Sequence, residues 1–517
     1  MPVEHTMMEL FRQQAARWPD RPALAGDGGR LTYAELDRAT LRIAQVLAAR
    51  GARTDEPVAV VAARGTGQLV ALLGVLRSGA PYVCLDVGQP DSRLTAQLAD
   101  SGARILLTDQ AQPGFTGTTI RLDDLPTPPA PAGDPRPAGP ADLACLVYTS
   151  GSTGAPKGVA VTHGGLANYA LHMVALLDCA DRPRTFASVT SLATDLGNTA
   201  VFPALASGGC VHLVPAPVVL DPVSFAHYCR TEALDYLKIT PSHLAALLSF
   251  GNAEVLPREA LVLGGEALPW ELLDTVRSLG RCRVINHYGP TETTIGSLTY
   301  EVGAAEAARR QGATVPIGRP IRATQIRVVD ERLEPVVDGA AGELLISGAG
   351  LARGYWRSPE QSKERFAVLA DGTRAYRTGD RVRRCADGAV EFLGRLDQQL
   401  KIRGHRVEPA EVEAALCLHP AVAQAAVAPV RDGMGQQVLA AFVVPASAAV
   451  PDVRDLRGHL GELLPPHMVP VSVELVSALP FTLSGKLDRG ALADRAHGAG
   501  ATAGGSGGRR GVPGAGR

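Results

Sequence analysis

Lysine is scarce in this 517-residue chain. Lysine and arginine together number 51, but only five of them are lysines, at positions 157, 238, 363, 401 and 486, which leaves 46 arginines (51 − 5). Arginine carries a planar, permanently charged guanidinium, whereas lysine carries a compact ammonium on a slim stem. A position that accepts either residue is expected to be arginine in such a composition. We therefore expect most of the five lysines to be retained for their chemistry.

The chain also lacks an excess of charge, a long apolar run and paired cysteines. Its 52 acidic residues balance the 51 basic ones, which argues against nucleic acid or an anionic membrane surface as a partner. No apolar run reaches the length of a membrane span, and the N-terminus lacks the layout of a signal peptide. The eight cysteines form no CxxC pair, so we expect free thiols and a location in the cytoplasm.

Short β-branched segments alternate with helical patterns up to about residue 300. The apolar segment 56–63 is followed by a helical pattern at 67–79 and by another apolar segment at 103–109. This alternation predicts parallel sheets with helices on both faces. The proline-rich residues 126–142 interrupt it and are expected to form an exposed loop. Further segments of the same apolar type lie at 234–240, 259–265 and 282–289.

From about residue 315 the pattern changes to short strands with tight turns. Residues 323–330, 342–348 and 381–395 fit a small antiparallel β-barrel at about 315–394, with a hairpin turn at Asp387-Gly388.

The chain as a whole is predicted to be α/β. We expect a large body over residues 1–394, made of two parallel-type sheets with helices and the small barrel. A hinge near residue 395 then leads to a small mobile α+β domain at 395–495. The glycine-rich residues 496–517 are expected to form a disordered tail.

The segment LACLVYTSGSTGAPKGVAVTH, residues 143–163, predicts a phosphate-binding loop. An apolar strand runs into Thr, Ser and Gly residues, and Lys157 and a second strand follow. Glycines let backbone N–H groups face a ligand, hydroxyls add donors and lysine adds charge, which together suit a polyphosphate. The glycine–lysine spacing is not that of a Walker loop. The alternative, a flexible Ser/Gly linker, is disfavoured by the two flanking strands.

YTSGSTGAPKG resembles the phosphate-loop signature of the adenylate-forming (ANL) superfamily, specifically the amino-acid adenylation domains of nonribosomal peptide synthetases. Further segments resemble the family's successive motifs, in order, along almost the whole chain. They are LTYAELDR (31–38), LRSGAPYVCLD (76–86), NHYGPTETT (286–294), GELLISGAGLARGYW (342–356), YRTGD (376–380), GRLDQQLKIRGHRVEPAEVE (394–413), LPPHMVP (464–470) and SGKLDR (484–489).

The resemblance implies an ATP- and Mg²⁺-dependent ligase that works in two half-reactions. An amino-acid carboxylate attacks the α-phosphate of ATP, which gives aminoacyl-AMP and pyrophosphate. The phosphopantetheine thiol of a carrier protein then displaces AMP. Because an anion must approach a polyanion, positive groups have to be aimed at the reacting phosphate.

The resemblance assigns four catalytic positions. Lys486 resembles the lysine that bridges the substrate carboxylate and the nucleotide oxygens, where a slim ammonium fits a crowded space. Glu292 resembles the Mg²⁺ ligand, and a carboxylate suits this hard cation. Thr291 is expected to donate to the α-phosphate, and Lys157 to bring charge to the phosphate loop.

The nucleotide site follows in the same way. Asp380 is expected to accept both ribose hydroxyls with Arg395 nearby, while Asn286, Tyr288 and the turn at 264–266 hold the adenine. The full set of implied nucleotide positions is Thr149, Ser150, Gly151, Ser152, Thr153, Gly154, Gly264, Gly265, Glu266, Asn286, Tyr288, Gly289, Asp380 and Arg395.

Roles are also predicted for three residues outside the catalytic and nucleotide sets. Asp397 matches the hinge position about which the small domain rotates between half-reactions. Lys401, in the same motif, is expected to face the thiolation chemistry. Lys363, in SPEQSKERF, is interpreted as part of a solvated helix face.

The substrate pocket departs from the family where an aromatic residue usually precedes the aspartate, because Thr194 stands there. Ungapped counting from FPALASG still places Asp195 where it pairs with the substrate ammonium, which favours an amino acid. Counting between motifs gives the other wall positions. These are Leu196, Thr199, Lys238, Val262, Gly264, His287, Ile295 and Gly296, with Lys486 closing the pocket.

The charges of this pocket predict an acidic substrate side chain. Asp195 is assigned to the substrate ammonium and Lys486 to the reacting carboxylate, so Lys238 is matched with the substrate side chain, with His287 beside it as a second donor. The set resembles the family's aspartate pattern, whereas its asparagine pattern has an acid at position 287. A 3-methyl or 3-hydroxy substituent is allowed for at Gly264 and Gly296. The alternative for Lys238 is a position at a strand end, facing solvent.

Three other functions compete with adenylation of L-aspartate. An acyl-CoA ligase for a dicarboxylic acid keeps the fold, but succinate brings no ammonium for Asp195. A nucleotide-binding module without activity is disfavoured by the presence of Lys486, Glu292 and Lys157. An asparagine-activating domain is the third alternative.

The expected partner is a carrier protein. Domains of this family often need a small MbtH-like protein as well, and the sequence leaves open whether this one does. No carrier-type GGxS segment follows Arg489 and no condensation domain is present. We therefore expect a stand-alone enzyme, or a piece of a larger synthetase, that meets its carrier in trans.

Overall fold

A computed structural model describes most of the chain. The described residues are 4–112, 114–127, 135–151, 156–249, 252–280, 282–303, 310, 312–433, 435–446, 451–480 and 487–503. Contacts divide the chain into two units, one formed by residues 1–149 and 156–398 and the other by residues 150–155 and 399–517. The predicted α/β class, with a large N-terminal body of mixed sheets and a small C-terminal domain, is confirmed.

The first unit contains a nine-stranded sheet in the order β15-β14-β13-β12-β11-β9-β10-β1-β2. The strands from β1 through β13 along this order are parallel, and antiparallel strands close both edges. The bounds are β1 Pro22–Gly26, β2 Gly29–Thr32, β9 Thr185–Ser188, β10 Cys210–Leu213, β11 Tyr236–Ile239, β12 Ala260–Gly264, β13 Arg283–Tyr288, β14 Leu298–Glu301 and β15 Arg319–Pro320.

A second sheet of this unit has seven strands in the order β18-β8-β7-β4-β3-β5-β6. Strands β3 to β7 run parallel to one another. Strand β8 then pairs antiparallel with β7 on one side and with β18 on the other. The bounds are β3 Val58–Val61, β4 Tyr82–Leu85, β5 Ile105–Thr108, β6 Thr118–Arg121, β7 Leu143–Thr149, β8 Lys157–Thr162 and β18 Gly354–Tyr355. β7 and β8 are the two strands predicted around the phosphate loop.

The predicted antiparallel barrel is an open five-stranded sheet, β16-β17-β20-β19 with β21 on β20. The turn at Asp387-Gly388 joins β20 to β21, and Gly388 has a φ of +83°, a conformation that glycine adopts without strain. The bounds are β16 Thr324–Val329, β17 Ala341–Gly348, β19 Phe366–Val368, β20 Arg374–Arg384 and β21 Val390–Arg395.

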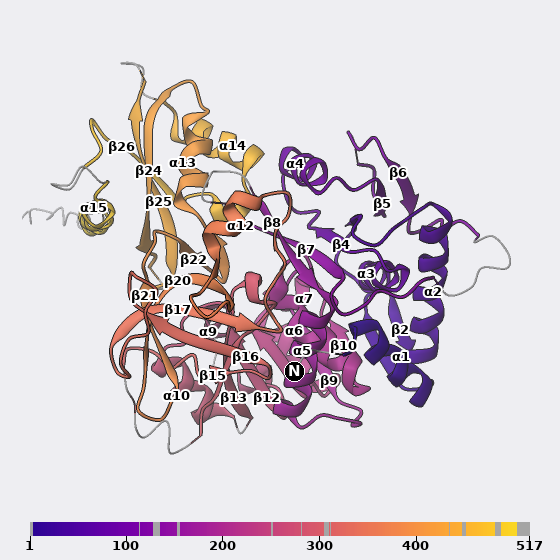
Figure 1. The fold of residues 1–517 in the computed structure, drawn as a ribbon. Helices are drawn as coiled ribbons and strands as arrows, with labels where there is room; N and C mark the ends of the chain where they lie inside the picture. The colour runs from indigo at the N-terminus through magenta and orange to yellow at the C-terminus, as the bar shows by residue number, and fades with distance from the viewer. Residues whose placement is uncertain are drawn as a thin grey trace, which may run out of the picture. The chain divides into compact units, whose positions relative to one another are not determined.

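Helices cover both faces of the nine-stranded sheet (Figure 1). One core cluster joins side chains of both large sheets with those of α1, α2, α3, α5 and α6, and another packs α8, α9 and α10 on the opposite face. The bounds are α1 Met7–Arg17, α2 Tyr33–Ala49, α3 Thr66–Ser78, α4 Asp91–Ser101, α5 His163–Leu177, α6 Asp195–Ser207, α7 Ala216–Leu220, α8 Pro222–Thr231, α9 Pro241–Leu248, η1 Ala253–Val255, α10 Trp270–Leu279, η2 Thr291–Thr293 and α12 Pro359–Arg365.

The sequence sets the start of two of these helices directly. At α1 the Thr6 hydroxyl accepts from the Glu9 N–H while the Glu9 carboxylate accepts from the Thr6 N–H, and Thr32 with Glu35 repeats this capping box at α2. Such reciprocal bonds satisfy backbone donors that a helix start leaves unpaired. Both helices then turn their apolar residues into the core.

In the second unit, α13 and α14 pack on one face of the sheet β24-β25-β26 and α15 packs on the other (Figure 1). Helix α15 runs to Ala503. Residues 504–517 of the predicted tail lie outside the described part. The bounds are β22 Leu400–Ile402, β23 His405–Val407, α13 Pro409–Cys417, β24 Val422–Arg431, β25 Gln437–Pro445, α14 Val453–Leu463, η3 Pro466–Met468, β26 Ser472–Leu475 and α15 Arg489–Ala503.

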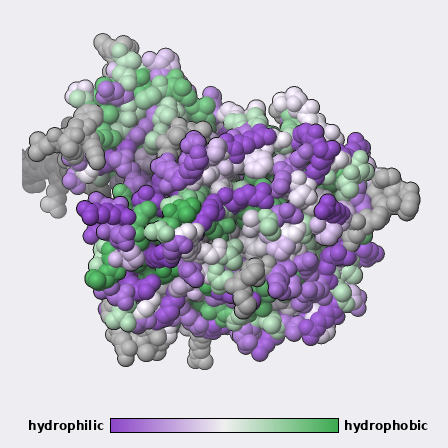
Figure 2. Space-filling model, viewed as in Figure 1, coloured by the Kyte–Doolittle hydropathy of each residue, from purple (hydrophilic) through white to green (hydrophobic). Residues whose placement is uncertain are grey.

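Among the described residues, none of the helices combines the length and the apolar composition needed to cross a membrane. On the face seen in Figure 2, hydrophilic and hydrophobic residues are interspersed. In the described part of the chain all eight cysteines are free thiols, as predicted.

Candidate active site

The predicted substrate pocket gathers at three neighbouring parallel strands of the nine-stranded sheet. Lys238 on β11 is in register with Val262 on β12, and Gly264 at the end of β12 is in register with His287 on β13. Side chains two residues apart on a strand share a face. All four residues therefore lie on the sheet face covered by α5 and α6, at the carboxyl ends of the strands, where open α/β sheets bind ligands.

Lys238 and His287 are in contact and almost completely buried. Their exposed fractions are 4% and 3%, and Lys238 Nζ lies 3.3 Å from His287 Nδ1. Lys238 is thus not a solvent-facing residue at a strand end. Burial, followed by the charge of Lys238, holds the pKa of His287 well below its usual range, so its imidazole is neutral.

The sequence interpretation had His287 as a second donor to the substrate. In the structure its two ring nitrogens contact Lys238 Nζ and the hydroxyl of Tyr169 on α5, the latter at 2.9 Å. The Tyr169 hydroxyl in turn donates to Thr199 Oγ1 on α6 at 3.0 Å. Both ring nitrogens of His287 are therefore in contact with protein groups.

The two pocket glycines make room for protein groups. A Cβ atom on Gly264 would lie 2.5 Å from Lys238 Nζ, and one on Gly296 would lie 2.0 Å from His287 Nε2. No real Cβ makes such contacts, so both positions need glycine for packing. The side chains of Lys238 and His287 therefore pack directly against the two glycines.

Asp195 is the first residue of α6, and its side chain meets Thr291 of η2. The Thr291 hydroxyl donates to Asp195 Oδ2 at 2.6 Å. The structure therefore brings together the residue expected to bind the substrate ammonium and the one expected to donate to the α-phosphate. Leu196 follows Asp195 and lies 3.3 Å from an ideal Cβ of Gly265, and Ile295 is buried with a φ of +66°.

Glu292 and Lys157 meet around Tyr355. The carboxylate of Glu292 is fully buried and accepts a 2.8 Å hydrogen bond from the Tyr355 hydroxyl. Lys157 Nζ donates to the same hydroxyl at 3.1 Å, lies 4.2 Å from the Tyr355 ring centroid and 4.0 Å from Glu292 Oε1. A buried carboxylate beside an ammonium suits Mg²⁺ bound to polyphosphate, because Mg²⁺ uses one or two carboxylates together with phosphate oxygens.

Asp380 and Arg395 form a second polar cluster. Arg395 Nη1 donates to Asp380 Oδ1 at 2.6 Å, and the Tyr288 hydroxyl donates to Asp380 Oδ2. Burial and the neighbouring Asp380 raise the pKa of Tyr288 well above its usual range, which keeps it a donor. Arg395 also holds the predicted hinge residue Asp397 through two bonds of 2.6 and 2.7 Å.

Two side chains expected around the adenine, Asn286 and Glu266, form hydrogen bonds within the protein. The Asn286 amide donates to the backbone oxygens of Val315 and Pro316, at 3.2 and 2.8 Å, and so fixes the segment that follows β14. Glu266 accepts from the N–H and hydroxyl of Ser242 at 2.9 and 2.7 Å. Both side chains therefore shape the backbone near the turn at 264–266.

Gly289 has a packing role. A Cβ atom there would lie 2.5 Å from Gly296 Cα. The glycine thus lets the chain pass close to the pocket wall.

Only part of the phosphate loop is described. Thr149 ends β7, opposite Lys157, and its buried hydroxyl has no hydrogen-bond partner among the described residues. Ser150 and Gly151 group with the second unit, where the Ser150 hydroxyl donates to the Arg406 carbonyl at 2.9 Å and the Gly151 N–H to Glu411 at 3.3 Å.

Several predicted residues lie elsewhere or beyond the described residues. Ser152, Thr153, Gly154 and Lys486 fall outside the described part, so their assigned roles stay predictions. Lys401 lies on β22 of the second unit, paired with Arg406. Lys363 is 74% exposed and pairs with Glu360 on α12, as predicted for a solvated helix face.

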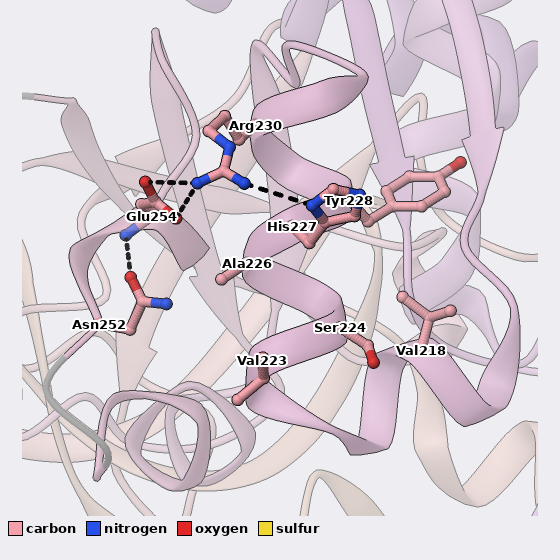
Figure 3. A pocket seen from close by; sticks show the side chains of 9 residues that line it. All are labelled: Val218, Val223, Ser224, Ala226, His227, Tyr228, Arg230, Asn252 and Glu254. Atoms are coloured by element: carbon pink, nitrogen blue, oxygen red, sulfur yellow. Dashed lines mark hydrogen bonds and ion pairs between the residues drawn. The ribbon is translucent and has the colours of Figure 1, made fainter.

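A surface pocket of about 570 Å³ lies apart from these residues, between α7, α8 and η1 (Figure 3). Its polar groups bond to one another. Arg230 pairs with both carboxylate oxygens of Glu254 at 3.0 Å and contacts His227 Nδ1 at 3.2 Å. None of the predicted site residues lines this pocket.

Two residues of the site were missed from the sequence, Tyr169 and Tyr355. Tyr355 lies within GELLISGAGLARGYW, so its motif was a signal. Tyr169 lies in a helix of ordinary apolar pattern, seven residues after the end of β8, and nothing in the sequence distinguishes it from a core residue.

Comparison with known proteins gives the class of this fold and site. The family model for "AMP-binding enzyme" matches residues 11–356, and that for "AMP-binding enzyme C-terminal domain" matches residues 411–486. The chain therefore belongs to the AMP-binding enzyme family.

Three similar proteins illustrate the match. Surfactin synthase subunit 2 of Bacillus subtilis is 37% identical over 507 residues, which are 95% of this chain but only 14% of that protein. NpsA-ThdA, an artificially fused adenylation–PCP di-domain from Klebsiella oxytoca, is 27% identical with a TM-score of 0.82, over 91% of this chain and 94% of that one. The o-succinylbenzoate CoA synthetase MenE of Bacillus subtilis is 26% identical with a TM-score of 0.83, over 96% and 99% of the two chains.

Proposed function

We propose that this protein activates the α-carboxylate of L-aspartate with ATP and transfers the aspartyl group to the phosphopantetheine thiol of a carrier protein, as an AMP-forming ligase of natural-product biosynthesis. Such a reaction suits the cytoplasm, where ATP is available. The observation that carries the proposal is the buried ammonium of Lys238, 4% exposed, in the wall of the predicted pocket. An ammonium in a low-dielectric site attracts a carboxylate far more strongly than it does in water.

The two ends of the substrate have separate partners in this proposal. Asp195, at the start of α6, pairs with the substrate ammonium, and Lys238 pairs with the side-chain carboxylate. Lys486 is left for the carboxylate that reacts. Since Lys238 and His287 fill the space beside Gly264 and Gly296, we favour unsubstituted aspartate over its 3-substituted forms.

ATP is proposed to bind with its phosphates near Lys157 and Glu292 and its ribose on Asp380. Mg²⁺, when bound, would neutralise phosphate charge and polarise the α-phosphate. Glu292 would hold the cation, Lys157 would bring a fixed positive charge to the phosphates, and Thr291 would donate a hydrogen bond to the α-phosphate. The Tyr355 hydroxyl bonds to both Glu292 and Lys157 and so fixes their positions.

A second candidate, an acyl-CoA ligase for a dicarboxylic acid, is favoured by the likeness to the MenE structure. It differs in one testable respect, because a dicarboxylic acid has no ammonium for Asp195. A domain that activates asparagine would in turn have no anion for Lys238.

ATP–pyrophosphate exchange on the purified protein tests these functions. The acids compared are L-aspartate, L-asparagine, L-glutamate, 3-substituted aspartates and succinate, each with and without an MbtH-like protein. We expect exchange with L-aspartate. Lys238→Ala is expected to lower kcat/KM for aspartate by at least about 30-fold, the equivalent of about 2 kcal/mol for one partner of a buried charged pair.

Lys363→Ala is the matched control, because Lys363 is an exposed lysine paired on the surface of α12. It should leave exchange unchanged. Preferred exchange with asparagine or succinate would refute the aspartate proposal, and release of AMP with coenzyme A but not with a loaded carrier would support the second candidate.

A further inference from the structure

A chain of hydrogen bonds runs from the pocket lysine into the core between α5 and α6. Lys238 Nζ lies 3.3 Å from His287 Nδ1, His287 Nε2 lies 2.9 Å from the Tyr169 hydroxyl, and that hydroxyl lies 3.0 Å from Thr199 Oγ1. Tyr169 and His287 are fully or almost fully buried, and their rings meet edge-on at 5.6 Å. The four residues come from four elements, β11, β13, α5 and α6.

The direction of each bond follows from the donors available. An ammonium has hydrogens to donate and no lone pair, so His287 Nδ1 must accept from Lys238. A neutral imidazole carries a single proton, which is then on Nε2 and points at the tyrosine oxygen. Burial lowers the pKa of His287 and raises that of Tyr169, which keeps both side chains neutral. The Tyr169 hydrogen is left for Thr199.

We infer that Tyr169 is a specificity-determining positioning residue: its hydroxyl accepts the His287 Nε2 proton, thereby fixes the orientation of the imidazole whose Nδ1 accepts from Lys238, and so holds the ammonium of Lys238 in the substrate pocket. This inference rests on the proposed role of Lys238 in binding the substrate side chain. Tyr169 itself has no assigned contact with the substrate, and it acts only through His287.

Removal of the hydroxyl has a specific consequence. In Tyr169→Phe the Nε2 proton loses its acceptor, while Nδ1 still accepts from Lys238. The buried donor is left unsatisfied, so the imidazole ring turns toward another acceptor and carries the ammonium of Lys238 out of its wild-type position. The ring of phenylalanine still fills the same space, which preserves the packing of α5 on the sheet.

The experiment is ATP–pyrophosphate exchange with the acid that the wild-type protein activates best. Tyr169→Phe is expected to raise KM for that acid about tenfold while kcat and KM for ATP stay within about twofold of wild type. Discrimination between L-aspartate and L-asparagine should fall by a similar factor. Tyr236→Phe is the matched control, because its buried hydroxyl donates to the Leu177 carbonyl at 3.0 Å in the same core cluster.

Thr199→Val gives a second, independent variant. The Tyr169 hydroxyl loses its acceptor there, and to reach another it must turn its lone pair away from the His287 Nε2 proton. KM should therefore rise as in Tyr169→Phe, and the double variant should be no worse than the more affected single one, since both act through the orientation of the His287 ring.

The outcomes separate this inference from the proposed function. If the best acid is not aspartate, the proposed function fails while the KM test of Tyr169 still stands. If Tyr169→Phe behaves like Tyr236→Phe, or loses kcat at an unchanged KM, the inference is overturned.

Nitrogen-15 NMR of histidine-labelled protein reads the tautomer without any activity. The His287 signals are identified by their loss in His287→Asn. We expect a protonated Nε2 and a bare Nδ1 in both proteins, and an Nε2–H signal in Tyr169→Phe shifted to the position of a proton without a hydrogen bond. A wild-type His287 protonated on Nδ1 would overturn the inference whatever acid the protein activates.

Discussion

The ammonium nitrogen of Lys238 lies in the space that a side chain at position 264 would need. An ideal Cβ on Gly264 would be 2.5 Å from Lys238 Nζ and 2.2 Å from the backbone oxygen of His287. The lysine is flexible, but the backbone of β13 is held by its neighbours β12 and β14 and cannot move aside. A glycine is therefore a condition for a buried cation at this point of the sheet.

Gly264→Ala should consequently damage both the pocket and the sheet. We expect a loss of about 1–3 kcal/mol in the free energy of unfolding, typical of overpacking, together with loss of amino-acid-dependent exchange. Thermal unfolding and exchange assays measure the two effects. Gly67→Ala in α3 is the control, because a Cβ there meets nothing within 4 Å. Equal behaviour of the two variants would contradict the packing of Lys238 against Gly264.

Tyr355→Phe should slow adenylation without unfolding the protein. The Tyr355 hydroxyl receives a bond from Lys157 and donates one to the buried Glu292, and its loss leaves both side chains less fixed. Hydrogen bonds to charged groups contribute about 1.5–3 kcal/mol, so kcat for exchange should fall about 10- to 100-fold.

Tyr33→Phe is the control for this variant. The hydroxyl of Tyr33 is equally buried but donates to the backbone oxygen of Gly209, at 2.8 Å, on a part of the sheet that carries none of the predicted site residues. An unchanged kcat in Tyr355→Phe would remove Tyr355 from the site.

Arg395→Lys should weaken ATP binding. Arg395 reaches Asp380 with one nitrogen and Asp397 with two others, a fork that a single ammonium cannot reproduce. We expect KM for ATP to rise about tenfold and KM for the amino acid to change little. Arg353→Lys, an exposed arginine 3.1 Å from Asp55, should have no effect on either constant.

Stability should fall below neutral pH because of His163. This residue is fully buried at the start of α5, and burial lowers its pKa to about 4. The unfolded chain takes up a proton below about pH 6.5, whereas the folded chain does so only near pH 4. The stability contributed by the neutral ring is thus complete above pH 6.5 and is lost as the pH falls toward 4.

By linkage, His163 alone should cost about 1 kcal/mol between pH 6.5 and 5.5. Urea unfolding of the wild type and of His163→Asn at both pH values measures this, since the variant should lose that much less stability over the interval. The same pH dependence in both proteins would exclude His163 as its source.

Much of the fold follows from local patterns in the sequence. The apolar segments at 56–63, 234–240 and 259–265 became β3, β11 and β12, and the helical pattern at 67–79 became α3. Periodicity and turn residues depend only on neighbouring positions in the chain, so they can be recognised without knowledge of the tertiary fold.

The sequence by itself determined the class of chemistry, through motifs whose residues are neighbours in the chain, such as TSGSTG and the YGPTE that contains Glu292. Only the tertiary structure decided that Lys238 is buried rather than solvent-facing. It also decided that both ring nitrogens of His287 contact protein groups and that one of these groups is the hydroxyl of Tyr169. Tyr169 and His287 are 118 positions apart. Their contact depends on the order of strands in one sheet and on how α5 crosses it, and no local pattern encodes a crossing of elements that far apart.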